Sequence, residues 1–165
     1  IARPAELASD TAGKVPAIRH CVEEAERISG TRFDIVVDLD VTSPFRSVED
    51  IRIAVELLEG KQASNVITGA RARKSPYFNL VEVSEKGIVT LSKQPAHPVL
   101  RRQDAPKCFD MNASIYVWTR DSLYKKEGIF LDKTLLFEMP VERSLEIDSE
   151  LDFEIAHFLW RQQNG

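Results

Sequence analysis

The strongest constraint on the fold is a strand, a helix and a second strand that follow one another at short spacing. Residues 34–39 (DIVVDL) form a short apolar run rich in β-branched side chains, which is typical of a strand covered on both faces. Ser47 and Asp50 stand three apart, as in a capping box, and predict the start of a helix that Gly60 ends. Residues 64–70 (SNVITGA) predict the next strand. This spacing favours a βαβ unit, and hence a mostly parallel sheet with helices on its faces.

The flanking segments continue the alternation of helix and strand. Residues 15–28 place apolar side chains on one helical stripe, and residues 149–162 predict a last helix. Two further strands are predicted at 113–119 (ASIYVWT) and 134–139. The pattern thus predicts an α/β fold.

The middle of the chain departs from this pattern. Residues 71–111 contain four of the eight prolines and two short strand-like runs, 78–83 and 88–91, with a turn at Lys86–Gly87 between them. We therefore predict a single α/β domain over residues 1–165, with an inserted β arm over residues 71–111.

Composition narrows the class of protein. The 165 residues suit one domain with a real core, and the formal charge of −4 speaks against a general nucleic-acid binder. No apolar run approaches the roughly 18 residues of a membrane helix, so no membrane role is expected. The two isolated cysteines indicate a reducing, cytoplasmic setting. The first residue is Ile1 rather than Met, so we expect a piece of a longer protein.

Two polar segments are predicted at the sheet edge where open α/β sheets bind ligands. One is 40–46 (DVTSPFR), after the first strand, and the other is 146–148, before the last helix. Glu146 and Asp148 are two apart in an extended segment, so their carboxylates face the same side and are able to converge on one hard cation.

A different interpretation of the second segment is a helix cap. Asp148 or Ser149 would then cap the last helix, and Asp152 would complete a capping box.

Five motifs occur together, in collinear order, over essentially the whole chain: RPAELASDT (3–11), TSPFR (42–46), RQDAP (102–106), NASIY (112–116) and IDSELD (147–152). This series closely resembles the CMP-sialic acid synthetases, the acylneuraminate cytidylyltransferases. The resemblance implies a Rossmann-like nucleotidyltransferase fold. It also implies that the anomeric hydroxyl of a sialic-acid-like sugar attacks the α-phosphate of CTP with Mg²⁺, releasing pyrophosphate. A homodimer is implied as well, with the β arm reaching the partner's active site.

The resemblance assigns roles near the nucleotide and the metal. Asp148 is implied as a catalytic Mg²⁺ ligand. Glu146 stands where the family typically has Asp, so it would bind the metal or help to deprotonate the sugar hydroxyl. Arg3 is implied beside the nucleotide, where a guanidinium hydrogen-bonds phosphate or base; the alternative is a surface arginine near the chain end.

Five substrate-binding residues are implied around the sugar: Asp40, Arg102, Asn112, Tyr116 and Phe130. Arg102 matches the arginine that meets the sugar carboxylate, or else forms a salt bridge of the arm or the dimer. Asn112 and Tyr116 match positions around the sugar, although Tyr116 equally fits a core position. Phe130 falls near an aromatic pair beneath the acyl group.

Asp40 departs from the family pattern, because a Gln that contacts the sugar is usual there. An Asp would prefer a hydroxyl or an amine on the substrate. We therefore hypothesise a substrate other than N-acetylneuraminate, such as pseudaminic or legionaminic acid or an 8-amino octulosonate. The alternative is that Asp40 binds only metal or backbone.

One part of the family pattern is missing, because no glycine-rich phosphate loop occurs and the seven glycines are scattered. The sequence is then a C-terminal portion, or the loop is supplied elsewhere or absent. The leading hypothesis is a CTP-dependent cytidylyltransferase for a nine-carbon 2-keto sugar acid. The alternatives are an octulosonate cytidylyltransferase and a non-catalytic module that retains sugar binding and dimerisation.

Overall fold

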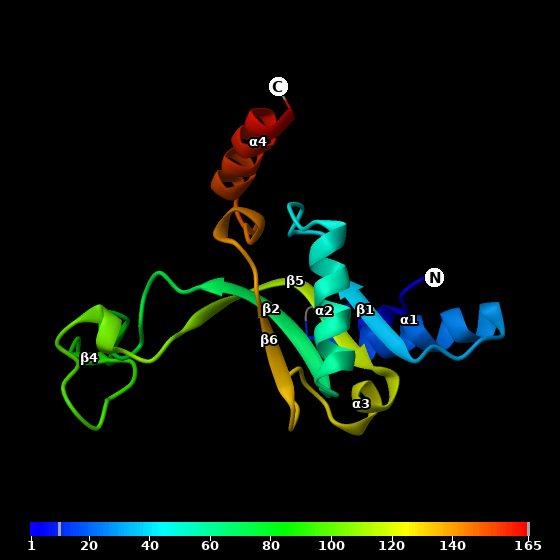
Figure 1. The fold of residues 1–165 in the computed structure, drawn as a ribbon, viewed down its shortest axis with the longest axis horizontal. Coiled ribbons are helices and arrows are strands. Elements are labelled where there is room, and N and C mark those ends of the chain that lie inside the picture. The colour runs from blue at the N-terminus through cyan, green and yellow to red at the C-terminus, as the bar shows by residue number, and fades with distance from the viewer. Residues whose placement is uncertain (10, 165) are drawn as a thin grey trace.

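A four-stranded sheet forms the centre of the computed structural model, which describes residues 1–9 and 11–164 (Figure 1). The order of the strands is β1-β5-β2-β6, and all four predicted central strands are confirmed. Their bounds are Ile35–Leu39 for β1, Asn65–Arg71 for β2, Phe109–Thr119 for β5 and Thr134–Glu138 for β6.

The sheet is mixed, whereas the sequence predicted a mostly parallel one. Strands β1, β2 and β6 run in one direction, and β5 runs antiparallel between β1 and β2. The reason lies in the connection from β2 to β5. The chain leaves β2 at one edge of the sheet, passes through the β arm and re-enters β5 at that edge, so β5 runs back beside β2.

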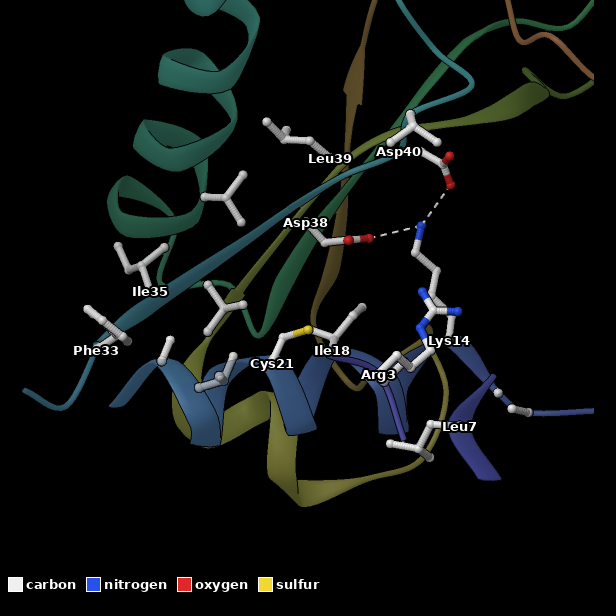
Figure 2. Close-up of a pocket in the computed structure, with 18 of the residues that line it drawn as sticks. Arg3, Leu7, Lys14, Ile18, Cys21, Phe33, Ile35, Asp38, Leu39 and Asp40 are labelled. Carbon is white, nitrogen blue, oxygen red and sulfur yellow. Dashed lines mark hydrogen bonds and ion pairs between the residues drawn. The ribbon is translucent and has the colours of Figure 1, made fainter. Parts of the chain in front are cut away.

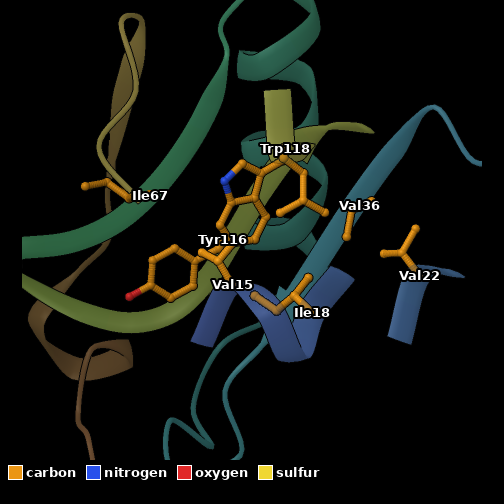
Figure 3. Close-up of a cluster of buried hydrophobic side chains, with 8 residues drawn as sticks. Val15, Ile18, Val22, Val36, Ile67, Tyr116 and Trp118 are labelled. Atoms are coloured by element: carbon orange, nitrogen blue, oxygen red, sulfur yellow. The ribbon is translucent and has the colours of Figure 1, made fainter. Parts of the chain in front are cut away.

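Helices cover both faces of the sheet. Helix α1 (Lys14–Ser29) and the short α3 (Arg120–Lys125) pack on one face, and α2 (Val48–Gly60) packs on the other. The core on the α1 face, shown in Figure 3, consists of Val15, Ile18, Val22, Val36, Ile67, Tyr116, Trp118 and Leu123. Alternate residues of β5, Ile115 and Val117, face α2.

Helix α2 begins and ends as the sequence predicted. The Ser47 side chain accepts a hydrogen bond from the Asp50 N–H (3.1 Å), and the Asp50 carboxylate accepts one from the Ser47 N–H (2.8 Å). Gly60 is the last residue of the helix. Asp50 is fully buried and also binds Arg143, in the short helical turn Val141–Arg143.

The predicted arm contains a separate two-stranded sheet. Strands β3 (Val81–Val83) and β4 (Val89–Leu91) pair in antiparallel register across a turn in which Gly87 has a φ of +73°. The arm extends sideways from the central sheet, and Val83 and Ile88 are exposed on it (Figure 1).

The last helix, α4 (Glu150–Asn164), projects from the same edge of the sheet and exposes Leu151 and Phe158 (Figure 1). Across the described residues, no helix combines the length and apolar character that a bilayer span requires.

Candidate active site at the carboxyl edge of the sheet

The loop that follows β1 is fixed by hydrogen bonds to its own polar side chains. Asp40 Oδ1 accepts from the Thr42 N–H (3.2 Å) and the Thr42 hydroxyl (3.0 Å). Arg46 Nη1 donates to the backbone carbonyls of Asp40 and Ser43, both at 2.6 Å. These contacts give the TSPFR motif a structural role, because they hold the Asp40 carboxylate in place at the end of β1.

A bulge in β5 lies next to this loop and forms a hydrogen bond with it. The register pairs Ile67 with Tyr116 and Gly69 with Met111, so two steps along β2 span five along β5. Within the bulge, Asn112 Oδ1 accepts from the Thr68 hydroxyl (2.7 Å), and the Asn112 carbonyl accepts from the Ser43 hydroxyl (2.9 Å).

Asn112 is only 3% exposed, and its amide nitrogen donates to Ser144 Oγ at 3.0 Å. All of these contacts lie within the chain. The backbone carbonyl of Asn112 therefore braces the loop through Ser43, while the side chain predicted to contact the sugar is engaged by Thr68 and Ser144.

Lys14, the first residue of α1, joins the two aspartates of β1 and its loop. Its Nζ lies 2.9 Å from Asp38 Oδ2 and 3.1 Å from Asp40 Oδ2, and 4.4 Å from the centre of the Tyr116 ring (Figure 2). Burial alone would lower the pKa of Lys14, but the two carboxylates outweigh it and raise that pKa. Burial likewise opposes ionisation of Asp40, yet hydrogen bonds from Thr42 and Lys14 lower the pKa of Asp40.

The second predicted segment lies beside this loop. The Ile147 N–H donates to the Thr42 carbonyl at 2.9 Å, which ties residues 146–148 to the end of β1. Burial raises the pKa of Glu146, and the negative charges of Asp148 and Asp40 raise it further. The structure thus brings Glu146, Asp148 and Asp40 within electrostatic range of one another.

The cap of α4 forms at Ser149. The Asp152 N–H donates to Ser149 Oγ (3.3 Å), and the Ser149 hydroxyl donates to Asp152 Oδ2 (2.7 Å). Within the described residues, no hydrogen bond or ion pair engages the Asp148 carboxylate. Capping therefore belongs to Ser149 and Asp152, and the Asp148 carboxylate stays available for another role.

A cavity of about 640 Å³ runs between α1 and β1 and ends at the Asp40 cluster, which consists of Lys14, Asp38 and Asp40 (Figure 2). Its polar lining includes Arg3, Lys14, Asp38 and Asp40. Its walls are largely apolar, with Ile18 and Val36 among them. Arg3, predicted beside a nucleotide, and Asp40, predicted beside a sugar, both line this cavity, and their roles there stay predictions.

Two predicted residues lie elsewhere in the chain. Arg102 donates to the backbone carbonyls of Ala72 (3.1 Å) and Arg73 (2.6 Å), and it lines a different cavity at the base of the arm. Phe130 is 68% exposed and precedes β6, so it lies at the opposite edge of the sheet from Asp40. A single chain does not bring either residue to the Asp40 cluster.

Known proteins similar to this chain identify its family. It is 43% identical over 162 residues to the post-translational flagellin modification protein B of Campylobacter coli, covering 98% of this chain and 68% of that protein. It is 42% identical, with the same coverage, to the CMP-N,N'-diacetyllegionaminic acid synthase of Campylobacter jejuni. The chain belongs to the CMP-sialic acid synthetase family.

More distant comparisons agree with this assignment. The N-acylneuraminate cytidylyltransferase of Streptococcus agalactiae is 26% identical over 93% of this chain and 35% of that protein. No family model matches. Among solved structures, the 4-diphosphocytidyl-2C-methyl-D-erythritol synthase of Anaerococcus prevotii superimposes with a TM-score of 0.61 at 11% identity. That likeness covers 92% of this chain and 68% of the other, and it confirms the Rossmann-like nucleotidyltransferase fold.

Carboxylate oxygens are the ligands that hard divalent cations prefer, and Glu146 and Asp148 are the candidates near this loop. Across the described residues, no group of three or more His, Cys, Asp or Glu side chains could hold a metal ion. The role of Glu146 and Asp148 as metal ligands therefore stays a prediction. The mutual repulsion that raises the pKa of Glu146 is what such a cation would relieve.

Sequence reasoning did not single out Lys14. The residue lies 24 positions from Asp38 and 26 from Asp40, and no local motif links them. The only signal was its position at the start of an amphipathic helix, directly after Gly13.

Proposed function

We propose that this chain carries out the transfer of CMP from CTP to a sialic-acid-like 2-keto sugar acid, releasing pyrophosphate, in the cytoplasm. The observation that carries the proposal is the 42% identity, over 98% of the chain, to a protein named CMP-N,N'-diacetyllegionaminic acid synthase. The cluster of Lys14, Asp40, Glu146 and Asp148 at the carboxyl edge of the sheet supports it.

In the proposed reaction, the anomeric hydroxyl oxygen forms a bond to the α-phosphorus. The bond from that phosphorus to the oxygen bridging to the β-phosphate breaks, and pyrophosphate leaves with the electron pair. The hydroxyl proton passes to a base or to water, and Glu146 is the candidate base if it does not bind metal. Arg3 would hydrogen-bond the nucleotide.

Glu146 and Asp148 would hold Mg²⁺, and a bound ion would neutralise charge on the phosphate oxygens. The two side chains are two residues apart in a non-helical segment that the Ile147 N–H fixes to the loop after β1. This attachment would keep both carboxylates next to the loop after β1, which begins at the cavity-lining residue Asp40.

The sugar would lie against Asp40, whereas Tyr116 is 5% exposed and packs in the core on the α1 face, as the alternative interpretation expected. Arg102 and Phe130 lie away from Asp40 in one chain, and a homodimer would reconcile the roles of all three. In that arrangement the arm of each protomer would carry Arg102 to the partner's site. The guanidinium would there form a bidentate pair with the sugar carboxylate.

The triphosphate would need one further element. The family resemblance implies a glycine-rich loop, and the chain spans 68% of each of the two Campylobacter relatives. We propose that a further segment supplies this loop in the complete enzyme.

The test is pyrophosphate release by the complete enzyme, with the phosphate loop present, from CTP and Mg²⁺ against sialic, pseudaminic, legionaminic and octulosonic acids. We expect release with one of the nine-carbon acids, and loss of it in Asp148→Asn. Glu150→Gln, an exposed carboxylate two residues later, is the matched control and should keep the activity. Release with only the octulosonate would contradict the proposed substrate, and no release with any acid would indicate a non-catalytic module. The relatives found favour neither of these alternatives.

A further inference from the structure

The Asp40 carboxylate already accepts three hydrogen bonds from its own chain. Lys14 Nζ reaches Oδ2 at 3.1 Å, and the Thr42 N–H and hydroxyl reach Oδ1 at 3.2 and 3.0 Å. Asp38 shares the same ammonium at 2.9 Å (Figure 2). The sequence suggested that Asp40 would prefer a hydroxyl or an amine on the substrate, and the structure shows that Lys14 already supplies an ammonium to this carboxylate.

A substrate ammonium that paired with Asp40 would have to approach the oxygen that Lys14 contacts. It would then stand about one ion-pair distance from Lys14 Nζ, where two like charges repel. Lys14 carries three N–H groups, of which one donates to Asp40 Oδ2 and at most one more is engaged by the ion pair with Asp38. The remaining N–H suits an oxygen acceptor, such as a hydroxyl or the carbonyl of an acylamino group.

We propose that Lys14 is a specificity-determining residue, which gives Asp40 its counter-ion so that the subsite accepts a hydroxyl or acylamino group and rejects a free ammonium. The inference rests on the proposed function, because it assigns a selection rule to the proposed sugar site. Its location supports it: Lys14 and Asp40 line the same cavity, and the Lys14 side chain is 36% exposed at its edge.

The test uses 2-O-methyl glycosides of neuraminic and legionaminic acids, with each amino group either acetylated or free. These probes do not turn over, so isothermal titration calorimetry reports dissociation constants that are independent of catalysis. The wild-type chain should bind the acetylated forms at least about tenfold more tightly than the free amines.

Three variants separate the charges. In Lys14→Met, Asp40 lacks its counter-ion, so the preference should shift toward the free amine by about tenfold for at least one nitrogen. In Lys14→Met combined with Asp38→Asn and Asp40→Asn, all three charges of the cluster are absent, and the preference should return to within about threefold of neutrality. Lys125→Met, which removes an exposed lysine of α3, is the matched control and should leave the preference unchanged.

An unchanged preference in Lys14→Met would overturn the role of Lys14. Failure of the wild-type chain to bind any of the glycosides would instead refute the proposed sugar site, and the selection rule with it. The two failures are distinguished by whether the wild-type chain binds any glycoside. A double-mutant cycle on the unfolding free energy of the unliganded chain measures the coupling between positions 14 and 40, and coupling would show that the ion pair forms whether or not a sugar binds.

Discussion

Among the ion pairs with a solvent-exposed partner, we expect the one between Arg143 and Asp50 to lower the free energy of unfolding most when it is removed. Arg143 donates to both oxygens of Asp50, at 2.8 and 2.7 Å, and the Asp50 side chain is fully buried while that of Arg143 is 39% exposed. Truncating one partner of a buried pair typically costs about 3–5 kcal/mol, because it leaves a buried charge unpaired. Water reaches the exposed part of Arg143 and Ser47 still donates to Asp50, so we expect about 2–3 kcal/mol for Arg143→Met.

Urea unfolding followed by circular dichroism measures this cost. Arg52→Met is the matched control on the same helix, because Arg52 is 55% exposed and pairs with exposed Glu49 and Glu56. It should lose less than about 1 kcal/mol. Adding Asp50→Asn to Arg143→Met should recover part of the loss by removing the buried charge. A loss in Arg143→Met no larger than that in Arg52→Met would refute the reasoning.

Two further changes test the sheet and the helix–loop contacts. A Cβ at Gly69 would lie 2.6 Å from the Asp110 carbonyl oxygen, so Gly69→Ala should cost about 1–3 kcal/mol in urea unfolding. Gly60→Ala, where no described neighbour lies within 4 Å of the added atom, should cost nothing; equal losses would contradict this argument. Hydrogen bonds, first from Arg120, lower the pKa of Glu26 to about 2, below its usual 4.5. The ionised Glu26 therefore stabilises the fold above pH 4.5, and this stabilisation is lost as the pH falls toward 2. Over that pH range, the free energy of unfolding should fall less in Glu26→Gln than in the wild-type chain.

Much of the framework follows from local sequence. The β-branched run at 34–39 and the capping residues Ser47 and Asp50 act over a few residues, and the structure confirms both elements. The direction of β5 does not follow from local sequence, because it depends on where the arm returns to the sheet. The strand pattern at 113–119 is the same whichever way the strand runs.

The candidate site was predictable only in part, for a similar reason. Glu146 and Asp148 follow from their position before a helix and from the family motif. The surroundings of Asn112 do not follow from local sequence. Ala113 has a φ of +47°, and the bulge there breaks the two-residue alternation that would place Asn112 on the same face as Tyr116. Lys14 meets Asp38 and Asp40 only once α1 has packed on the sheet.

The most direct test of the proposed chemistry is ³¹P NMR of CTP, Mg²⁺ and a nine-carbon 2-keto sugar acid incubated with the complete enzyme, which includes the phosphate loop. Nucleotidyl transfer predicts that a phosphodiester signal and pyrophosphate appear in equal amounts, that both require the sugar, and that Asp148→Asn abolishes both. Hydrolysis of CTP that proceeds equally without the sugar, or CTP that stays intact with every sugar acid, would contradict it.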